Sequence, residues 1–300
     1  MARIFLLAFI SISLFTNCQD DEWRSLFNGK ELPSYPHYLG IPDSSFDVPG
    51  LKRDSAGNYI ERLGTRDPLG VYSIDTLDGE PVIRVSGQAI GGLVLHDSLS
   101  NYHLRLKFKW GNYKWDWMEG RPKDGGILYH QGNGVRHELQ IHEGDVGSYW
   151  AKDVALDIPA RYTSEIPEAI IKAKPFLLDL VSTLNDTMLI FDPKAPMHHF
   201  DGKNGYKDWQ IVIANPYNEN PHGEWNVLEV ICYENHAIHK INGKVNMVLL
   251  NSYYESKGEK IPLNSGRLVL QSEGAVIFFK DIEMKDLSET PELLKPYLDK

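Results

Sequence analysis

A short run of alternating residues carries the densest set of groups that could do chemistry. It reads His137-Glu138-Leu139-Gln140-Ile141-His142-Glu143. Alternate side chains of a β-strand point to opposite faces, so Glu138, Gln140 and His142 share one face and the aliphatic residues share the other. A carboxylate, an amide and an imidazole in one row can bind hydroxyl groups, supply a general base or hold a metal ion. A plain solvated polar face is the alternative interpretation.

Further candidate residues surround this row. His130 ends the run from Asp124 to His130, which we expect to pair with the row as a hairpin. The flanks of the last predicted strands carry Gln271 and Glu273, and Lys109 alternates with aromatic core residues. Tyr149 and Trp150 could stack on the apolar face of a sugar, although aromatic rings more often serve as core. The histidines His198, His199 and His222 are expected at the surface or at a rim.

The elements that must position these groups are predominantly β-strands. Period-two alternation of apolar and polar residues predicts a series of strands with one covered face. Asn242-Gly243 between two such runs predicts a hairpin, because both central residues of a type I′ turn need positive φ. Many short strands with few helices indicate a β-sandwich or jelly roll. The predicted strands cover residues 82–85, 104–110, 126–130, 137–142, 227–231, 267–272 and 275–279.

One proline-rich region, residues 151–223, interrupts this pattern. We expect it to form a long irregular insertion, with a short helix at Glu168–Lys174 and a strand at Thr187–Phe191. Long irregular segments in compact domains are usually functional or disordered. Its many aromatic residues favour an ordered segment.

The N-terminus has the pattern of an export signal. Arg3 precedes an apolar stretch that is too short to span a bilayer, and the stretch ends at Cys18 in a loose lipobox. The following Gln19-Asp20-Asp21-Glu22 resembles the acidic export tags of Bacteroidetes lipoproteins. We therefore expect a lipid on Cys18 and an outer-membrane location, facing the periplasm or the cell surface. An ordinary secretory peptide with an incidental cysteine is the alternative.

Composition excludes several classes of protein. The net charge is -10 and no cluster of Lys or Arg is present, which argues against a nucleic-acid partner. With Cys18 and Cys232 as the two cysteines, no disulfide framework can stabilise the fold. The expected boundaries are a signal peptide at 1–17, a lipidated tether at 18–24, one jelly-roll domain at 25–288 and a tail at 289–300. No feature specifies an oligomeric state.

Several short motifs, in their order and spacing, resemble the bacterial 3-keto-disaccharide hydrolase family, also described as 3-keto-glucoside lyase/hydratases. The resemblance covers nearly all of the mature chain, and each motif alone is weak. It departs from the family at Glu31-Leu32-Pro33-Ser34-Tyr35, where a Trp is usual, and at His96, where a Lys is common. The matching segments are Leu26–Lys30, Gly91–Val94, Gly125–Tyr129, Glu138–Ile141, Gly223–Asn226, Asn242-Gly243, Leu268–Ala275 and Phe278–Ile282.

The resemblance implies a concanavalin A-like jelly-roll β-sandwich with a ligand site on its concave face. It also implies cleavage of glycosides whose C3 hydroxyl is oxidised to a ketone. In that chemistry a base removes the C2 proton and the C1 oxygen leaves by elimination, after which water adds back. Glu138 or His142 would be the base, and Gln140 and Gln271 would bind hydroxyls.

An enolate formed in this way needs a stabilising group. Lys109 or His130 could supply it, or a divalent metal ion held by Glu138, His142 or Glu143. A non-catalytic surface carbohydrate-binding lipoprotein is the first alternative function, because jelly rolls serve as binding modules as readily as enzymes. A laminarinase-like glycoside hydrolase is the second, and it would need two carboxylates about 5 to 5.5 Å apart.

Overall fold

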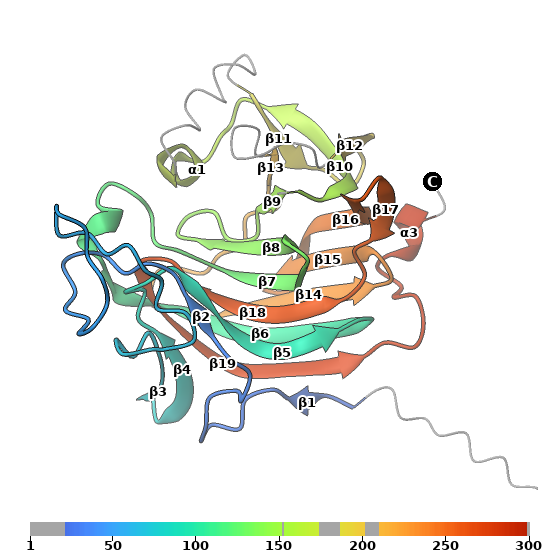
Figure 1. The fold of residues 1–300 in the computed structure, drawn as a ribbon. Coiled ribbons are helices and arrows are strands. Elements are labelled where there is room, and N and C mark those ends of the chain that lie inside the picture. Colours follow the sequence, from blue (N-terminus) through green and yellow to red (C-terminus); the bar gives the residue numbers. More distant parts are fainter. Residues whose placement is uncertain (1–21, 152, 174–186, 202–209, 299–300) are drawn as a thin grey trace, which may run out of the picture.

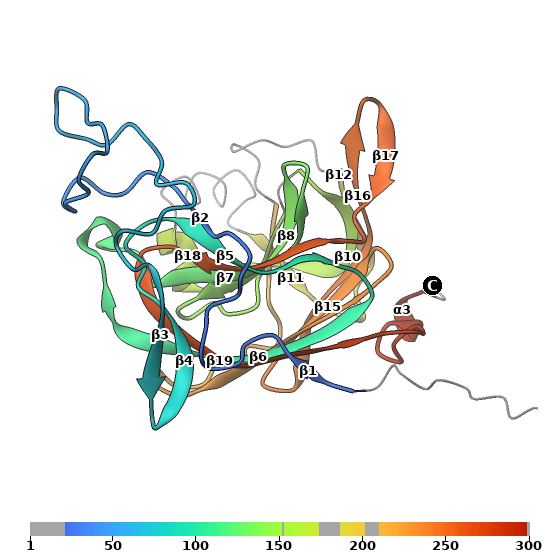
Figure 2. The same cartoon turned by 60° about the horizontal axis from the view of Figure 1, so that its bottom comes forward.

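The computed structural model describes residues 22–151, 153–173, 187–201 and 210–298. Nineteen strands in these ranges form one continuous sheet that folds into a β-sandwich of two packed layers, called here the first and second sheets, so the predicted concanavalin A-like jelly-roll class is confirmed (Figures 1 and 2). Cys18 and the predicted signal peptide lie outside the described residues. No helix within the described ranges is long and apolar enough to cross a membrane.

The first sheet forms the layer of the sandwich that does not contain the 137–143 run. Its long central strands, β6 and β19, pair with each other over most of their length. In order, the sheet contains β3 (Tyr72–Leu77), β4 (Glu80–Val85), β19 (Ala275–Asp286), β6 (Tyr102–Lys114), β14 (Asn226–Tyr233), β15 (His236–Ile241) and β16 (Lys244–Ser256), and β1 (Arg24–Ser25) pairs with the far half of β19.

The second sheet carries most of the candidate residues. Its centre is formed by β18, β7 and β8, which lie side by side although β18 is far away in the sequence. In order, the sheet contains β2 (Tyr38–Leu39), β5 (Gly91–Leu99), β18 (Gly266–Ser272), β7 (Asp124–Gly132), β8 (Val135–His142), β9 (Tyr149–Ala151), β13 (Gln210–Ile213), β11 (Met188–Phe191) and β10 (Ala155–Thr163).

The predicted hairpin between β15 and β16 is present. Asn242 and Gly243 have φ angles of 47° and 80°, and Ile241 pairs with Lys244 across the turn. Both central residues adopt the positive φ that a type I′ turn requires.

The main core fills the space between the sheets. Phe108 and Phe279 of the first sheet and Tyr129 and Leu139 of the second are all fully buried there. Two smaller apolar clusters lie on the outer face of the second sheet. One contains Val94, Leu128 and Val269 with Tyr35 packed against them, and the other contains Trp150, Ile170, Met188, Ile211 and Ile213.

The region 151–223 is more regular than its prolines suggested. Its predicted helix is present as α1 (Glu168–Ala173) and its predicted strand as β11. In addition, β10, β12 (Met197–Asp201) and β13 extend the second sheet at the top of the molecule in Figure 1. Pro159 lies within β10 opposite Met197, so sheet pairing tolerates this proline.

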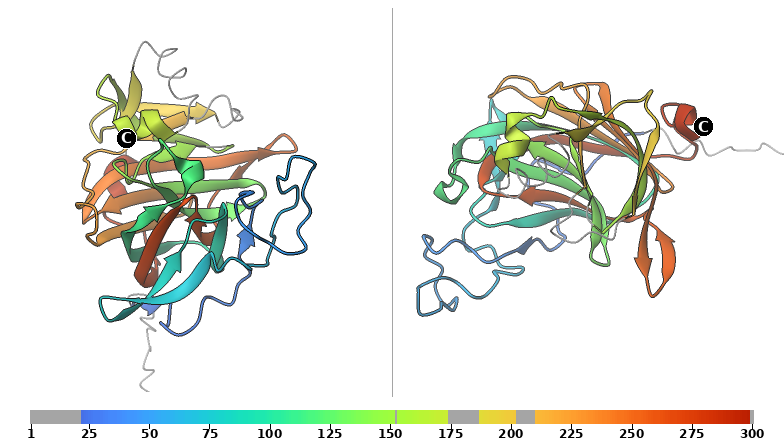
Figure 3. Two further views of the ribbon diagram at one scale, coloured as in Figure 1. Left: turned by 90° about the vertical axis from the view of Figure 1, so that its left-hand side faces the viewer. Right: turned by 90° about the horizontal axis from the view of Figure 1, so that it is seen from above.

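Three segments lie at the periphery of the sandwich. Between β2 and β3 the chain forms long loops that project from the sandwich in every view (Figure 3). At the C-terminus, α3 (Lys295–Leu298) follows Leu294, which is fully buried in the main core. Leu294 therefore anchors this segment to the core, while α3 itself has no buried residue. A short hairpin of β16 and β17 (Glu259–Pro262) extends beyond the sheets.

Candidate functional site

Strand β8 divides its residues between the two faces as its sequence predicts. Leu139 and Ile141 are fully buried in the core between the sheets, while Glu138, Gln140 and His142 lie on the outer face of the second sheet. Four neighbours lie on the same face, and together these residues form what we call the polar strip. It contains Arg136, Glu138, Gln140 and His142 of β8, Asp124 of β7, and Gln271 and Glu273 at the end of β18.

At the centre of the polar strip, two side chains converge above a glycine. A Cβ atom on Gly126 would lie 2.6 Å from Oε1 of Gln271 and 3.3 Å from Oε1 of Glu138. Nε2 of Gln271 donates a hydrogen bond to Oε2 of Glu273 at 2.8 Å, so the orientation of the amide is fixed. Its Oε1 atom is buried and accepts no hydrogen bond among the described residues. This oxygen is suited to a ligand hydroxyl, and Gly126 leaves space for it.

A chain of polar contacts runs from Gln140 toward the next turn. Nε2 of Gln140 donates to Oδ1 of Asp124 at 2.5 Å. Oδ2 of Asp124 lies 3.9 Å from Nε2 of His142, and the other ring nitrogen, Nδ1, lies 4.0 Å from Oδ2 of Asp145. His142 is only 1 % exposed. Each imidazole nitrogen therefore faces a carboxylate in a buried setting.

Burial also changes the acidity of Asp145. Its side chain is fully buried, and this raises its pKa to about 7, although hydrogen bonds from Ser148 and Tyr217 act in the opposite direction. The nearby Glu219 raises the pKa of Asp145 further, and burial raises the pKa of Glu219 as well. Asp145 therefore changes its charge in the range where an imidazole ordinarily does.

Arg136 is the cation that the structure brings to Glu138. Its Nη2 atom lies 3.3 Å from Oε2 of Glu138, and the two side chains are 25 % and 7 % exposed. Its Nε atom is buried and makes no hydrogen bond among the described residues. The ion pair stabilises the charged carboxylate of Glu138.

Trp150, which the sequence offered as a sugar-stacking or core residue, lies on the outer face of the second sheet but is buried. Trp150 is 4 % exposed, packs with the cluster that includes Ile170 and Ile211, and lies edge-on to His142. Tyr149, its neighbour on β9, points into the main core, where its hydroxyl forms a 2.8 Å hydrogen bond with Nδ1 of His137. Tyr149 is thus on the opposite face from the polar strip, as alternation along β9 requires.

Two candidates for enolate stabilisation are not brought to the polar strip. His130 follows Tyr129 at a β-bulge, and its φ of 47° turns the imidazole into the core, with Nδ1 3.3 Å from the carbonyl oxygen of Leu263. Lys109 belongs to β6 in the first sheet and pairs with Asp78 at 3.3 Å. No local sequence pattern indicates that a bulge reverses His130 or that Lys109 lies in the other sheet.

The three residues predicted to hold a metal ion do not converge. Glu138 and His142 are four residues apart on one strand, which separates them by about 13 Å. Glu143 lies beyond the strand, within 3.4 Å of Nζ of Lys123 and 3.3 Å of His222. In the part of the chain that the structure describes, no group of three or more His, Cys, Asp or Glu side chains is arranged to hold a metal ion. The predicted donor set therefore does not fit a single ion.

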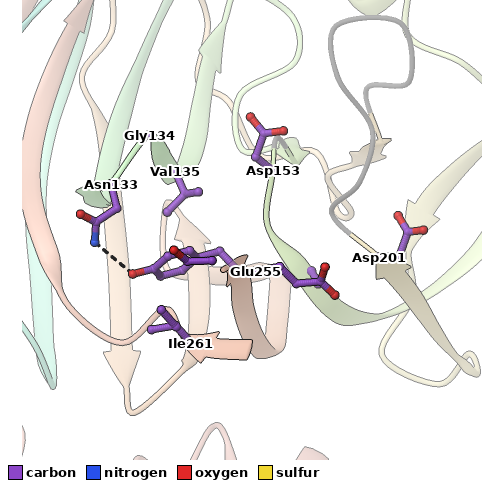
Figure 4. A pocket seen from close by; sticks show the side chains of 10 residues that line it. Asn133, Gly134, Val135, Asp153, Asp201, Glu255 and Ile261 are labelled. Atoms are coloured by element: carbon purple, nitrogen blue, oxygen red, sulfur yellow. Dashed lines mark hydrogen bonds between the residues drawn. The ribbon is translucent and has the colours of Figure 1, made fainter. Parts of the chain in front are cut away.

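A separate cleft of about 760 Å³ lies between the turn of the β7–β8 hairpin and the β16–β17 hairpin (Figure 4). Nδ2 of Asn133 donates to the hydroxyl of Tyr254 at 3.0 Å on its wall. Asp153, Asp201 and Glu255 also line it, and none of the polar strip does. We place the candidate site at the polar strip because it brings a carboxylate and a cation together with a buried amide oxygen that accepts no hydrogen bond among the described residues.

Three residues of the site were missed from the sequence. Arg136 could have been found, because it continues the period-two row one step before Glu138. Asp124 was noted only as the start of a run, and its place beside Gln140 depends on the pairing of β7 with β8. Asp145 lies in the turn after β8, and no sequence pattern pointed to it.

Comparison with solved structures found distant similarities. A candidate glycosyl hydrolase from Parabacteroides distasonis is 17% identical, with a TM-score of 0.40, and the match covers 89% of this chain and 94% of that one. A second such protein from the same organism is 14% identical, with a TM-score of 0.37 and coverages of 74% and 93%. A carbohydrate-binding module from Bacillus subtilis is 7% identical, with a TM-score of 0.37 and coverages of 72% and 92%.

Comparison with curated proteins found no match. A model of one protein family, the 3-keto-alpha-glucoside-1,2-lyase-like domain, matches residues 22–285. This range includes every residue of the polar strip and both sheets apart from the last residue of β19. The chain therefore belongs to the family of 3-keto-alpha-glucoside-1,2-lyase-like domains.

Proposed function

We propose that this protein cleaves the glycosidic bond of 3-keto-glycosides by base-initiated elimination at the polar strip, followed by addition of water. Membership of its family makes carbohydrates its substrate class. The observation that carries the proposal is the convergence of the Glu138 carboxylate and the unpaired Gln271 oxygen above Gly126. A sugar ring over Gly126 would donate a hydroxyl hydrogen to Gln271 and present a neighbouring C–H bond to Glu138.

Glu138 suits the role of base better than His142. A ketone at C3 acidifies the C2 proton, and the carboxylate of Glu138 lies beside Gly126 with the Arg136 guanidinium 3.3 Å away. Both ring nitrogens of the almost fully buried His142 instead face carboxylates. Loss of the C2 proton gives an enolate, whose electrons expel the C1 oxygen as the double bond forms between C1 and C2. The departing alkoxide takes a proton from water, the resulting hydroxide adds to C1, and Glu138 returns its proton to C2, so that the net change is the addition of one water.

Arg136 suits the role that Lys109 and His130 cannot fill. Enolate formation moves negative charge onto the C3 oxygen, and a fixed cation stabilises this charge. The guanidinium of Arg136 adjoins the proposed base, and its buried Nε has no hydrogen-bond partner among the described residues. We therefore assign enolate stabilisation to Arg136.

The test compares a 3-keto-glucoside with its unoxidised parent. The purified domain is incubated with each compound in heavy water, and glycosidic release and exchange of the C2 proton are followed. We expect release and exchange from the keto compound alone. Glu138→Gln should lower turnover by a factor on the order of 10² to 10⁴, since it removes a general base without changing the shape of the side chain.

Two glycines of β7 provide a matched pair of variants. Gly126→Ala would place a methyl group within 3.3 Å of both Glu138 and Gln271, and it should abolish turnover of the keto compound. Gly132→Ala lies on the same strand with no atom within 4 Å of the new methyl group, and it should leave turnover unchanged. Equal activity of the two variants would mean that the reaction occurs elsewhere.

The same experiment separates the alternative functions. Binding of both compounds without turnover would refute the elimination and favour a non-catalytic carbohydrate-binding protein. Cleavage of the unoxidised parent, without C2 exchange, would favour an ordinary glycoside hydrolase with a carboxylate pair.

We also propose that the mature chain is a lipoprotein anchored through Cys18 to the outer membrane. The support is the sequence pattern at the N-terminus, which lies outside the described residues. Cells expressing the full chain should incorporate labelled palmitate into this protein, and Cys18→Ala should prevent it. Labelling that persists in Cys18→Ala would contradict this assignment.

A further inference from the structure

Asp145 has a geometry that ordinary turn residues do not need. It is fully buried, and its two carboxylate oxygens face different elements. Oδ1 accepts hydrogen bonds from the hydroxyls of Ser148 and Tyr217, the latter at 2.6 Å. Oδ2 accepts none among the described residues and lies 4.0 Å from Nδ1 of His142. A buried carboxylate oxygen next to an imidazole nitrogen commonly orients a histidine ring.

On the other side of the ring, Nε2 of His142 faces Asp124, whose second oxygen holds the Gln140 amide at 2.5 Å. The indole of Trp150 and the imidazole form a T-shaped pair with ring centroids 6.3 Å apart. The contacts thus form a line from Asp145 through His142 and Asp124 to Gln140. Because Nε2 of Gln140 donates to Asp124, the amide oxygen of Gln140 is left to accept from a ligand.

We propose that Asp145 is a positioning residue of the polar strip: it shares a proton with Nδ1 of His142, fixes the ring against Asp124, and so sets the orientation of the Gln140 amide. This inference rests on the proposed function for the ligand, but the contacts that carry it do not. At 4.0 Å the two groups lie just beyond hydrogen-bond distance, and a small approach would close a hydrogen bond. Glu219, Tyr217 and Ser148 are the other polar groups around Asp145.

The pKa of Asp145 is consistent with this role. Burial raises it to about 7, so a proton is available to the pair near neutral pH. Two groups that interact at such a distance titrate together, and their shared proton belongs to the pair.

The first test does not depend on turnover. In protein labelled with ¹⁵N-histidine, we expect a proton attached to Nδ1 of His142 that exchanges slowly with solvent at pH 7. Asp145→Ala should remove this signal, whereas Tyr217→Phe, which removes only a contact to Oδ1, should keep it. The same Nδ1 signal in Asp145→Ala and in the unchanged protein would overturn the inference. Near-ultraviolet circular dichroism of each variant reports whether the fold is intact.

The second test asks whether Asp145 acts through Gln140. Asp145→Asn should raise KM, or the Kd of the unoxidised glycoside, by about threefold to tenfold, the value of one hydrogen bond, with kcat nearly unchanged. In a Gln140→Ala background the same substitution should have no further effect. Additive losses would overturn the inference. If the keto compound is not turned over at all, the Nδ1 signal and glycoside binding still decide the role of Asp145, so the two proposals fail separately.

Discussion

The two faces of β8 bury histidines in opposite ways. On the inner face, His137 lies in the core with His130 and His239, and tyrosine hydroxyls bond His137 and His239 at 2.8 Å and 2.7 Å. Burial lowers the pKa of all three, to about 4 for His130 and about 3 for His239. On the outer face, His142 is as buried but lies between Asp124 and Asp145.

This difference separates a structural histidine from a candidate functional one. Burial is nearly equal on both faces, so burial does not distinguish them. The partner does: a tyrosine hydroxyl satisfies a neutral imidazole, whereas carboxylates stabilise a proton on it. The role of a histidine in a strand therefore depends on the groups that surround it in space, such as Asp124 on the neighbouring strand, which the residues beside His142 in the sequence do not reveal.

The largest effect expected from the comparison is acid sensitivity of the inner face. A histidine whose folded pKa lies below the unfolded value of 6.5 stabilises the fold above pH 6.5, and this stability is lost as the pH falls toward the folded pKa. When the pH falls from 7 to 5, His130 and His239 should each lower the free energy of unfolding by roughly 2 kcal/mol. His137 acts in the same direction. Urea unfolding at the two pH values measures the total.

The outer face should act in the opposite direction. The folded pKa of Asp145 is raised from 3.8 to about 7, so the fold loses stability as the pH rises between these two values. Relative to the unchanged protein, Asp145→Asn should therefore be more stable at pH 7.5 than at pH 5, by roughly 2 kcal/mol. The same urea series checks this difference. A constant difference across pH would show that Asp145 is not the opposing group.

A smaller effect is expected from one hydroxyl of the inner face. Tyr149→Phe would leave the buried Nδ1 of His137 without its partner and should lower the free energy of unfolding by about 1 to 2 kcal/mol. Turnover per folded molecule should not change. Tyr102→Phe is the matched control, because its buried hydroxyl has no N or O partner among the described residues, and its effect should be smaller. Equal losses would mean that the His137 bond contributes little.

The smallest effect is expected outside both faces of β8. Lys109 lies on the first sheet and pairs with the exposed Asp78. Lys109→Ala should change turnover by less than twofold and the free energy of unfolding by about 0.5 kcal/mol or less, as at most surface positions. A large loss of turnover would mean that the ligand reaches the first sheet and that the polar strip is not the whole site.

Much of the fold was predictable because period-two alternation is a local property. It predicted the strands at 104–110, 137–142 and 267–272, and it assigned Glu138, Gln140 and His142 to one face of β8. It did not reveal the strands of the region 151–223 beyond Thr187–Phe191. There, pairing between β10, β12 and β13 compensates for prolines that locally disfavour strands.

The sequence by itself determined the sandwich, the hairpin at Asn242-Gly243 and the polar face of β8, because propensity and alternation depend on neighbours in the chain. Only the tertiary structure decided which groups meet there. Strand pairing across long separations brings Gln271 to Gly126 and Asp124 to Gln140. A single bulge turns His130 inward, and Lys109 lies in the first sheet, away from the polar strip. These outcomes depend on register and packing between distant segments, which no local pattern encodes.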